Sequence, residues 1–191
     1  MLIKLDNENI VVGSANISTK PLKPFDSNVL NFLDLISKKI QNNNKTKFNS
    51  EISTFGFFCR KKNLQKLKKT HFIENNGTIR LGLGLAFHIT PSNIPTNFAY
   101  SLVFGLLCGN SNIIKLPSQN FYEIEQLCFI FNKALKKFPI IKKFILIVRT
   151  ENNEVFSKKI SEMSDLRVIW GGNQTINKFK DIKTSERCRD L

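Results

Sequence analysis

The sequence predicts an α/β fold in which a Rossmann-like parallel sheet follows a helical N-terminal segment. The residue pattern changes at Gly77: earlier residues are helical and irregular, whereas later ones alternate between short apolar runs and longer segments of helical periodicity. Length and composition agree with this reading. A chain of 191 residues, 41% of them hydrophobic, can fill the core of one ordinary domain with a small appendage.

Residues 1–78 are predicted to form a helical segment that packs on the domain after it. Asp26 or Ser27 can cap a helix over Val29–Ile40, where apolar residues follow a 3.6-residue period. A second helix is expected to start at residues 49–50. Its core-facing side chains would be those of Ile52, Phe55, Phe58 and Cys59.

Residues 79–191 are predicted to form the sheet domain, with strands that are nearly continuously apolar because both of their faces are buried. We place the strands at Arg80–Ile89, Asn112–Leu116, Phe144–Arg149 and Leu166–Trp170. Helices are expected at Thr96–Leu107, Phe121–Phe138 and Asn153–Met163. Connections of this kind are right-handed and give a parallel sheet. The stretch Asp181–Leu191 shows no apolar periodicity.

The formal net charge of +14 raises the question of nucleic-acid binding, because clustered Lys and Arg attract phosphates. Outside Arg60–Lys69 the basic residues are scattered. Within that run Leu64 and Leu67 keep helical spacing, which indicates a solvated helix face. We therefore expect no nucleic-acid partner, whereas acidic small molecules remain compatible with this charge.

No apolar stretch approaches the roughly 18 to 20 residues that a membrane span requires, and the N-terminus lacks the pattern of a signal peptide. The cysteines form no CxxC pair, so we expect reduced thiols and no metal site. They are Cys59, Cys108, Cys128 and Cys188. These features predict a cytoplasmic protein.

The turn after the first predicted strand holds an unusual polar residue. In an open α/β sheet, ligands bind at the C-terminal ends of the strands. There, in residues 90–95, Asn93 lies between two prolines that restrict the backbone. Spacing alone leaves Asn93 as either a turn-former and helix N-cap or an oxyanion donor. The usual GxGxxG fingerprint is absent, which argues against a standard Rossmann dehydrogenase.

Two runs are the most specific motifs of the chain: GLAFHITPSNIP at Gly84–Pro95 and GLLCGNSNIIKLPS at Gly105–Ser118. With weaker similarity at Phe55–Lys61 and Val168–Gly172, they resemble the bacterial LuxC-type acyl-CoA reductases of the aldehyde dehydrogenase superfamily. The resemblance implies that residues 79–191 are the NADP-binding, Rossmann-like cofactor domain of such an enzyme.

The resemblance also implies roles for individual residues. In the superfamily, a Pro-x-Asn-x-Pro turn supplies an amide to the oxyanion hole, and Asn93 matches it. Lys115 matches a lysine that lies against the adenosine ribose and any 2′-phosphate. Ser118 replaces a glutamate of many NAD-preferring relatives, which implies NADPH as the cofactor. The other implied cofactor contacts are Thr90, Pro91, Gly171 and Gly172.

The implied activity is the reduction of fatty acyl-CoA to fatty aldehyde by NADPH, through a cysteine acyl-enzyme. The superfamily nucleophile lies in a separate domain, and none of the cysteines present has that context. We therefore expect an incomplete chain that is inactive alone, and a homo-oligomeric full-length enzyme with acyl-protein synthetase or acyltransferase partners. The alternative is a noncatalytic nucleotide-binding or interaction module.

Two further residues have open roles. His88 ends a predicted strand beside the turn and is either packed in the core or an acid–base group. Cys188 has basic neighbours that could lower the pKa of its thiol, although it follows the fourth strand closely.

Overall fold

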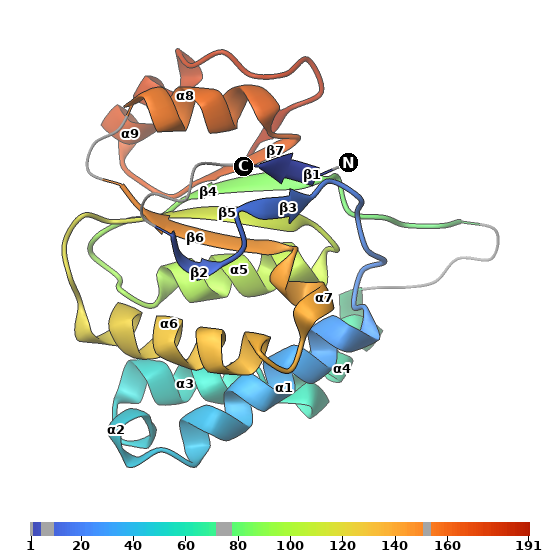
Figure 1. Ribbon diagram of the computed structural model, residues 1–191, viewed down its shortest axis with the longest axis vertical. Helices are drawn as coiled ribbons and strands as arrows, with labels where there is room; N and C mark the ends of the chain where they lie inside the picture. Colours follow the sequence, from blue (N-terminus) through green and yellow to red (C-terminus); the bar gives the residue numbers. More distant parts are fainter. Residues whose placement is uncertain (1, 5–9, 72–77, 151–153) are drawn as a thin grey trace.

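The computed structural model describes residues 2–4, 10–71, 78–150 and 154–191. Its centre is a six-stranded sheet in the order β2-β6-β5-β4-β7-β8 (Figure 1). The strands are β2 (Ile10–Gly13), β4 (Leu85–Ile89), β5 (Ser111–Leu116), β6 (Ile145–Arg149), β7 (Leu166–Ile169) and β8 (Arg189–Asp190). A separate antiparallel pair consists of β1 (Leu2–Lys4) and β3 (Asn16–Ser18).

Four neighbouring strands, β6, β5, β4 and β7, run parallel, as the sequence predicts. The edge strands were not predicted. β2 pairs antiparallel with β6, so the sheet is mixed rather than wholly parallel, and β8 pairs parallel with β7. Because β2 has four residues and β8 has two, neither is long enough to show a period of its own.

β4 covers only the second half of the range predicted for the first strand, Arg80–Ile89. A Cβ on Gly82 would lie 2.4 Å from the carbonyl oxygen of Gly109, and Gly84 has a φ of 132°, which favours glycine. The backbone N–H of Gly84 donates to the side-chain oxygen of Asn110 at 3.3 Å instead of to a strand. The first half of the range is therefore a loop fitted against the turn at Gly109.

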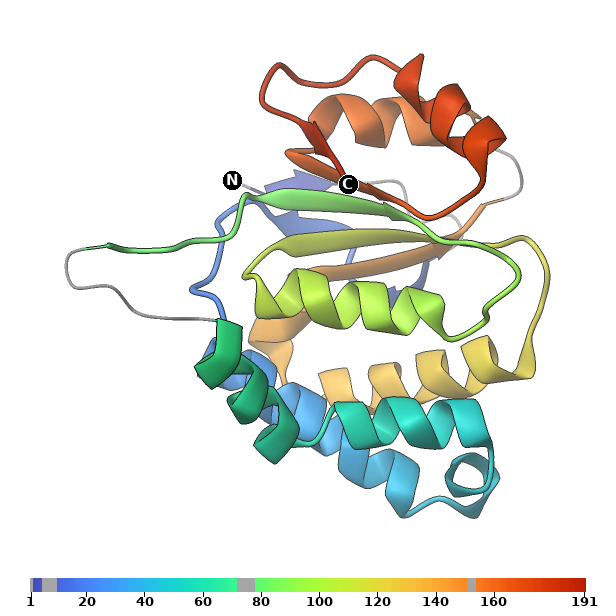
Figure 2. The same cartoon turned by 180° about the vertical axis from the view of Figure 1, so that it is seen from behind.

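Helices cover both faces of the sheet (Figures 1 and 2). One face carries α5 (Asn97–Leu107), α6 (Tyr122–Leu135) and the short α7 (Pro139–Lys142); the other carries α8 (Glu154–Met163) and α9 (Asn173–Lys180). The predicted ranges agree with α5, α6 and α8, although α6 ends three residues early and the predicted start of α8, Asn153, lies outside the described residues. Among the helices described, none is long and apolar enough to cross a bilayer.

The N-terminal helices form a further layer on α5 and α6, which we call the helical layer (Figure 1). Its members are α1 (Ser27–Gln41), α2 (Asn44–Lys47), α3 (Ser50–Phe58) and α4 (Lys61–His71). Asp26 caps α1, one of the two caps that the sequence predicts, and Asn49, at the predicted start of the second helix, caps α3. Each side chain accepts a backbone N–H. Phe55 of α3 meets Tyr100 of α5 and Phe131 of α6 edge-on, so one apolar core joins the layer to the sheet domain.

Candidate functional site

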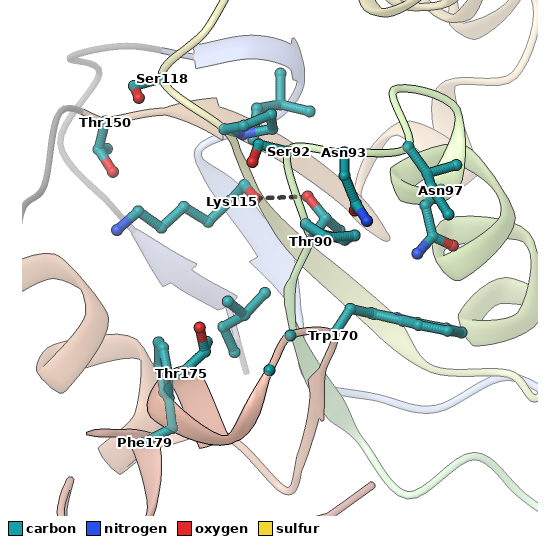
Figure 3. Close-up of a pocket in the computed structure, with 17 residues that line it drawn as sticks. Thr90, Ser92, Asn93, Asn97, Lys115, Ser118, Thr150, Trp170, Thr175 and Phe179 are labelled. Carbon is teal, nitrogen blue, oxygen red and sulfur yellow. Dashed lines mark hydrogen bonds between the residues drawn. The ribbon is translucent and has the colours of Figure 1, made fainter. Parts of the chain in front are cut away.

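A cavity of about 760 Å³ lies at the C-terminal ends of the parallel strands (Figure 3). The chain passes from β4 through β5 to β6 on one side, and then crosses to β7 on the other side of β4. Ligand crevices form at such switch points because the loops of the two strands leave toward opposite faces of the sheet. The volume lies within the roughly 300–1,000 Å³ of small-molecule and cofactor sites.

The structure brings all seven predicted site residues together in the lining of this cavity, which we call the nucleotide pocket. They are Thr90, Pro91, Asn93, Lys115, Ser118, Gly171 and Gly172. Their placement agrees with the rule that strand ends converge, whereas their binding roles remain predictions. Other lining residues were missed, among them Asn97, Thr150, Trp170 and Thr175. Thr150 directly follows β6, so the expectation that ligands bind at the C-terminal ends of the strands could have identified it.

Lys115 lies near the end of β5, opposite Ile89 of β4. Its carbonyl oxygen accepts the Thr90 hydroxyl at 3.0 Å, which ties the two strand ends together. Its Nζ atom is 3.4 Å from Ser157 Oγ. Partial burial lowers the pKa of Lys115, and the charge of Lys178 adds to the effect. The Glu154 carboxylate, which pairs with Lys178 at 2.5 Å, opposes the effect. The ammonium group of Lys115 is held partly out of water and favours an anionic ligand.

The glycine pair precedes α9 at the opposite wall of the pocket. Gly172 is the N-cap residue, and it offers no side chain to the first N–H groups of the helix. A Cβ on Gly172 would meet no atom within 4 Å, so the helix start is open. Gly171 is crowded, since its Cβ would lie 2.8 Å from Thr175 Cβ. This open helix N-terminus suits the approach of an anion such as a pyrophosphate.

Asn93 is exposed in the turn before α5. It does not cap that helix, because the N-cap residue is Thr96. The N-cap role that spacing left open is therefore excluded. Figure 3 shows Lys115 and Trp170 pointing toward opposite ends of the pocket, with Asn93 and Thr90 between them. An amide at this position can donate to a ligand that spans the pocket.

His88 is packed in the core beside the pocket and does not line it. Its Nδ1 atom is 2.6 Å from Ser101 Oγ, and its Nε2 atom is 3.0 Å from Asn112 Oδ1. Burial lowers the pKa of His88 to about 4, despite the opposing effect of the Asn112 hydrogen bond. The imidazole is neutral at physiological pH, and the packed role is the one that the structure supports.

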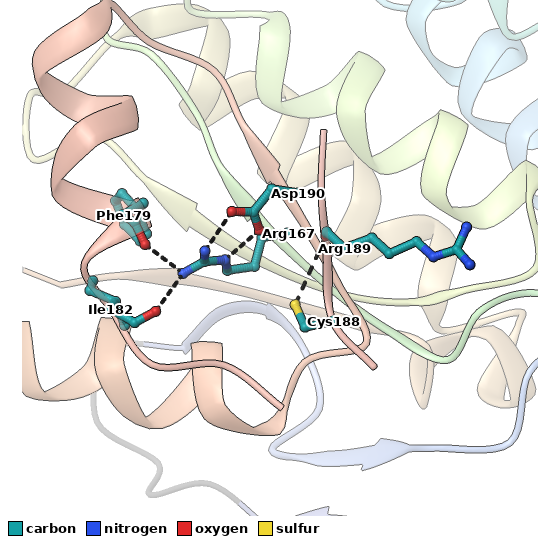
Figure 4. Close-up of polar contacts among 6 residues, drawn as sticks. All are labelled: Arg167, Phe179, Ile182, Cys188, Arg189 and Asp190. Carbon is teal, nitrogen blue, oxygen red and sulfur yellow. Dashed lines mark hydrogen bonds and ion pairs between the residues drawn. The ribbon is translucent and has the colours of Figure 1, made fainter. Parts of the chain in front are cut away.

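None of the four cysteines, all of which lie in the described parts of the chain, lines the nucleotide pocket. Burial raises the pKa of the Cys188 thiol, contrary to the lowering considered from its basic neighbours. Of its two sequence neighbours, Arg187 pairs with Asp165 at 2.6 Å. The carboxylates of Asp190 and Asp165 add to the raised pKa, whereas Arg167, which binds both carboxylate oxygens of Asp190 (Figure 4), opposes it. Within the described ranges, no three His, Cys, Asp or Glu side chains gather as metal ligands.

The chain is similar to known proteins in both sequence and structure. A family model described as acyl-CoA reductase (LuxC) matches residues 28–191. No curated protein matches the chain. Among solved structures, the chain is similar to an NAD-dependent benzaldehyde dehydrogenase from Corynebacterium glutamicum, with 15% identity and a TM-score of 0.62, over 90% of this chain and 42% of that one.

Two further structures are similar. One is the Rhodopseudomonas palustris propionaldehyde dehydrogenase with bound propionyl-CoA, at 13% identity and a TM-score of 0.54, over 91% of this chain and 46% of that one. The other is an engineered glycolyl-CoA reductase with bound NADP⁺, at 12% identity and a TM-score of 0.54, over 88% of this chain and 47% of that one. At these identities the likeness shows the fold, and it confirms the predicted class. The chain spans less than half the length of each of the three proteins.

Proposed function

The chain belongs to the acyl-CoA reductase (LuxC) family, and on that premise we propose that it supplies the NADPH site of an enzyme that reduces fatty acyl-CoA to fatty aldehyde. The observation that carries the proposal is the convergence of Asn93, Lys115 and the Gly171–Gly172 pair on one cavity at the strand ends. When bound, the cofactor supplies the hydride. The residues of the chain bind and orient it.

Three features of the pocket suit a phosphorylated dinucleotide. Lys115 would bind the 2′-phosphate as a point charge, and the exposed Ser118 presents no carboxylate to repel it. The open N-terminus of α9 at Gly172 would hold the pyrophosphate through backbone N–H groups. Thr90 and Pro91 would shape the wall between these two anion contacts.

Asn93 would donate its amide to the oxyanion that forms when a thiolate attacks the acyl thioester. Since no cysteine lines the pocket, we assign that thiolate to a part of the enzyme outside this chain. The chain alone is then expected to bind the cofactor without turning over fatty acyl-CoA. A homo-oligomeric full-length enzyme, with acyl-protein synthetase or acyltransferase partners, stays a prediction.

Calorimetric titration of the purified chain with NADPH and with NADH tests the proposal. We expect tighter binding of NADPH, and a loss of about tenfold to a hundredfold in Lys115→Ala, because a hydrogen bond to a charged group is removed. Lys136→Ala is the matched control, since it removes the same charge from the exposed end of α6. Equal affinities for the two nucleotides, or equal losses in the two variants, would contradict the assignment of Lys115.

A further inference from the structure

Behind the nucleotide pocket, four polar side chains form a continuous hydrogen-bonded chain, which we call the Trp170 relay. Trp170 Nε1 donates to Ser101 Oγ at 3.1 Å, and Ser101 Oγ is 2.6 Å from His88 Nδ1. His88 Nε2 is 3.0 Å from Asn112 Oδ1, and Asn112 Nδ2 donates to the Asn110 carbonyl at 2.8 Å. The relay thus connects the end of β7 to α5, β4 and β5.

The ends of the relay fix the direction of every hydrogen bond in it. At one end, the indole N–H of Trp170 can only donate, so Ser101 Oγ accepts from it. At the other end, Asn112 Nδ2 donates to the carbonyls of Asn110 and Phe144, and Asn112 Oδ1 can only accept, so His88 carries its proton on Nε2 and donates it to Asn112 Oδ1. The unprotonated Nδ1 of neutral His88 then accepts the hydroxyl hydrogen of Ser101. One neutral tautomer of His88 therefore satisfies the whole relay.

The relay is part of the buried core, since Ser101, His88 and Asn112 are 2%, 1% and 0% exposed. Gly105, one helical turn after Ser101, makes room for it: a Cβ on Gly105 would clash with Asn112 Oδ1, at 1.8 Å. Fully satisfied buried polar networks are rigid, because breaking one bond leaves a donor or an acceptor without a partner. The relay can therefore hold its outer member in a fixed position.

That outer member, Trp170, stands between two cavities. It lines the nucleotide pocket, and it also lines an apolar cavity of about 430 Å³ together with Phe104, Cys108 and Val168. Trp170 is 42% exposed and borders both cavities, so packing alone constrains the ring incompletely. A side chain that is only partly packed needs a hydrogen bond to stay in one rotamer, and Ser101 Oγ accepts that hydrogen bond.

We propose that the Trp170 relay fixes the Trp170 indole as the partition between the nucleotide pocket and the apolar cavity, which makes Ser101 and His88 positioning residues of the site. A rotated indole would open the pocket toward the apolar cavity and change its shape. The positioning depends on the hydrogen bonds alone, and only its use in cofactor binding rests on the proposed function.

Trp170 is the only tryptophan in the chain, so one indole N–H signal in the NMR spectrum, and all tryptophan fluorescence, report on this ring. In the wild-type chain we expect the indole N–H to exchange with solvent at least about tenfold more slowly than in the urea-unfolded chain. In Ser101→Ala, the protection should disappear, the emission should move to longer wavelength and acrylamide should quench it more strongly.

Ser161→Ala is the matched control. Ser161 is also a fully buried serine in a helix, but within the described part of the chain its Oγ has no hydrogen-bond partner. Its removal should leave the indole signal unchanged. The wild-type measurement needs no variant: exchange as fast as in the unfolded chain would overturn the proposal, as would equal protection in wild type and Ser101→Ala.

Titration with NADPH separates this inference from the proposed function, because reduced nicotinamide absorbs where tryptophan emits. Binding at the pocket should quench Trp170, which lines it. A protected indole that NADPH fails to quench would support the relay and contradict the proposed cofactor. Quenching of an unprotected indole would support the cofactor and contradict the relay.

Discussion

The helical layer packs on α5 and α6, whereas the nucleotide pocket lies at the C-terminal ends of the parallel strands, and the two regions use their side chains differently. In the helical layer, apolar side chains are buried against each other; Phe32 and Phe55 are fully buried. In the pocket, Asn93, Ser118 and Gly172 are exposed, and the start of α9 has no side-chain cap. Polar groups exposed in this way are hydrogen-bonded to water, so they can bind a ligand without breaking a contact within the protein. The helical layer should therefore determine stability, and the pocket should determine binding.

The largest effect is expected at Phe55, where three aromatic rings meet between α3, α5 and α6. Phe55→Ala should lower the free energy of unfolding by about 3–5 kcal/mol, because it removes a buried ring and leaves a cavity. Urea unfolding followed by circular dichroism measures the change. The control is Phe48→Ala at a 79% exposed ring beside α2, expected to cost less than about 0.5 kcal/mol. Similar losses of stability in both variants would contradict the conclusion that the buried side chains of the helical layer determine stability.

The elements of the fold also differ in how far the sequence could predict them. The helices α1 and α3 could be placed because their signals are local: apolar periodicity, with Asp26 and Asn49 as caps. The strands β2 and β8 could not, since their stability comes from distant partners. β2 depends on pairing with β6, and β8 depends on Arg167, which is 2% exposed and binds Asp190 and the carbonyls of Phe179 and Ile182 (Figure 4).

In the pocket, the rule of strand ends and the motif resemblance placed Asn93, Lys115 and Gly171 at one edge of the sheet, where the structure has them. The partner of Trp170 could not be predicted, because its bond to Ser101 joins residues 69 positions apart. A serine in an otherwise apolar helix carries no signal of that contact. The burial that raises the pKa of Cys188, and the pairing of Arg187 with Asp165, could not be predicted for the same reason, because both depend on contacts between distant parts of the chain.

The next largest effect is expected at His88, which lies beside the pocket but is buried, with a hydrogen-bond partner at each ring nitrogen. Its pKa is about 4 in the folded chain, against an ordinary value of 6.5. Between these two pH values the unfolded chain binds one more proton than the folded chain. The contribution of His88 to the free energy of unfolding is therefore fully present above pH 6.5 and decreases as the pH falls toward 4. From pH 7 to pH 5 the loss should be about 2 kcal/mol.

Urea unfolding of the wild type and of His88→Gln at both pH values measures this loss, since glutamine does not titrate. The difference between the two proteins should shrink by that amount at pH 5. Asp34, whose pKa lies below its ordinary value of 3.8, titrates mainly at lower pH and cancels in the comparison. Equal pH dependence in the two proteins would show that His88 is not held neutral by burial.

The smallest effect is expected at Asn93, and a matched asparagine makes it informative. Asn93→Ala should change the free energy of unfolding by less than about 0.5 kcal/mol, because Asn93 is exposed and Thr96 takes the N-cap position of α5. Nucleotide affinity should stay within about twofold, since the proposed partner of the amide is an oxyanion rather than the cofactor. Calorimetry and urea unfolding measure the two quantities.

Asn110→Ala is the same substitution at a buried position. The Asn110 side chain is 3% exposed, and its Oδ1 atom accepts the backbone N–H groups of Leu83 and Gly84 at 2.7 and 3.3 Å. Its loss leaves the buried N–H of Gly84 and the partly buried N–H of Leu83 without this acceptor, which costs about 1–3 kcal/mol. If Asn93→Ala destabilised the chain as much as Asn110→Ala, the pocket turn would carry stability as the core does. That result would contradict the division of roles between the helical layer, which should determine stability, and the nucleotide pocket, which should determine binding.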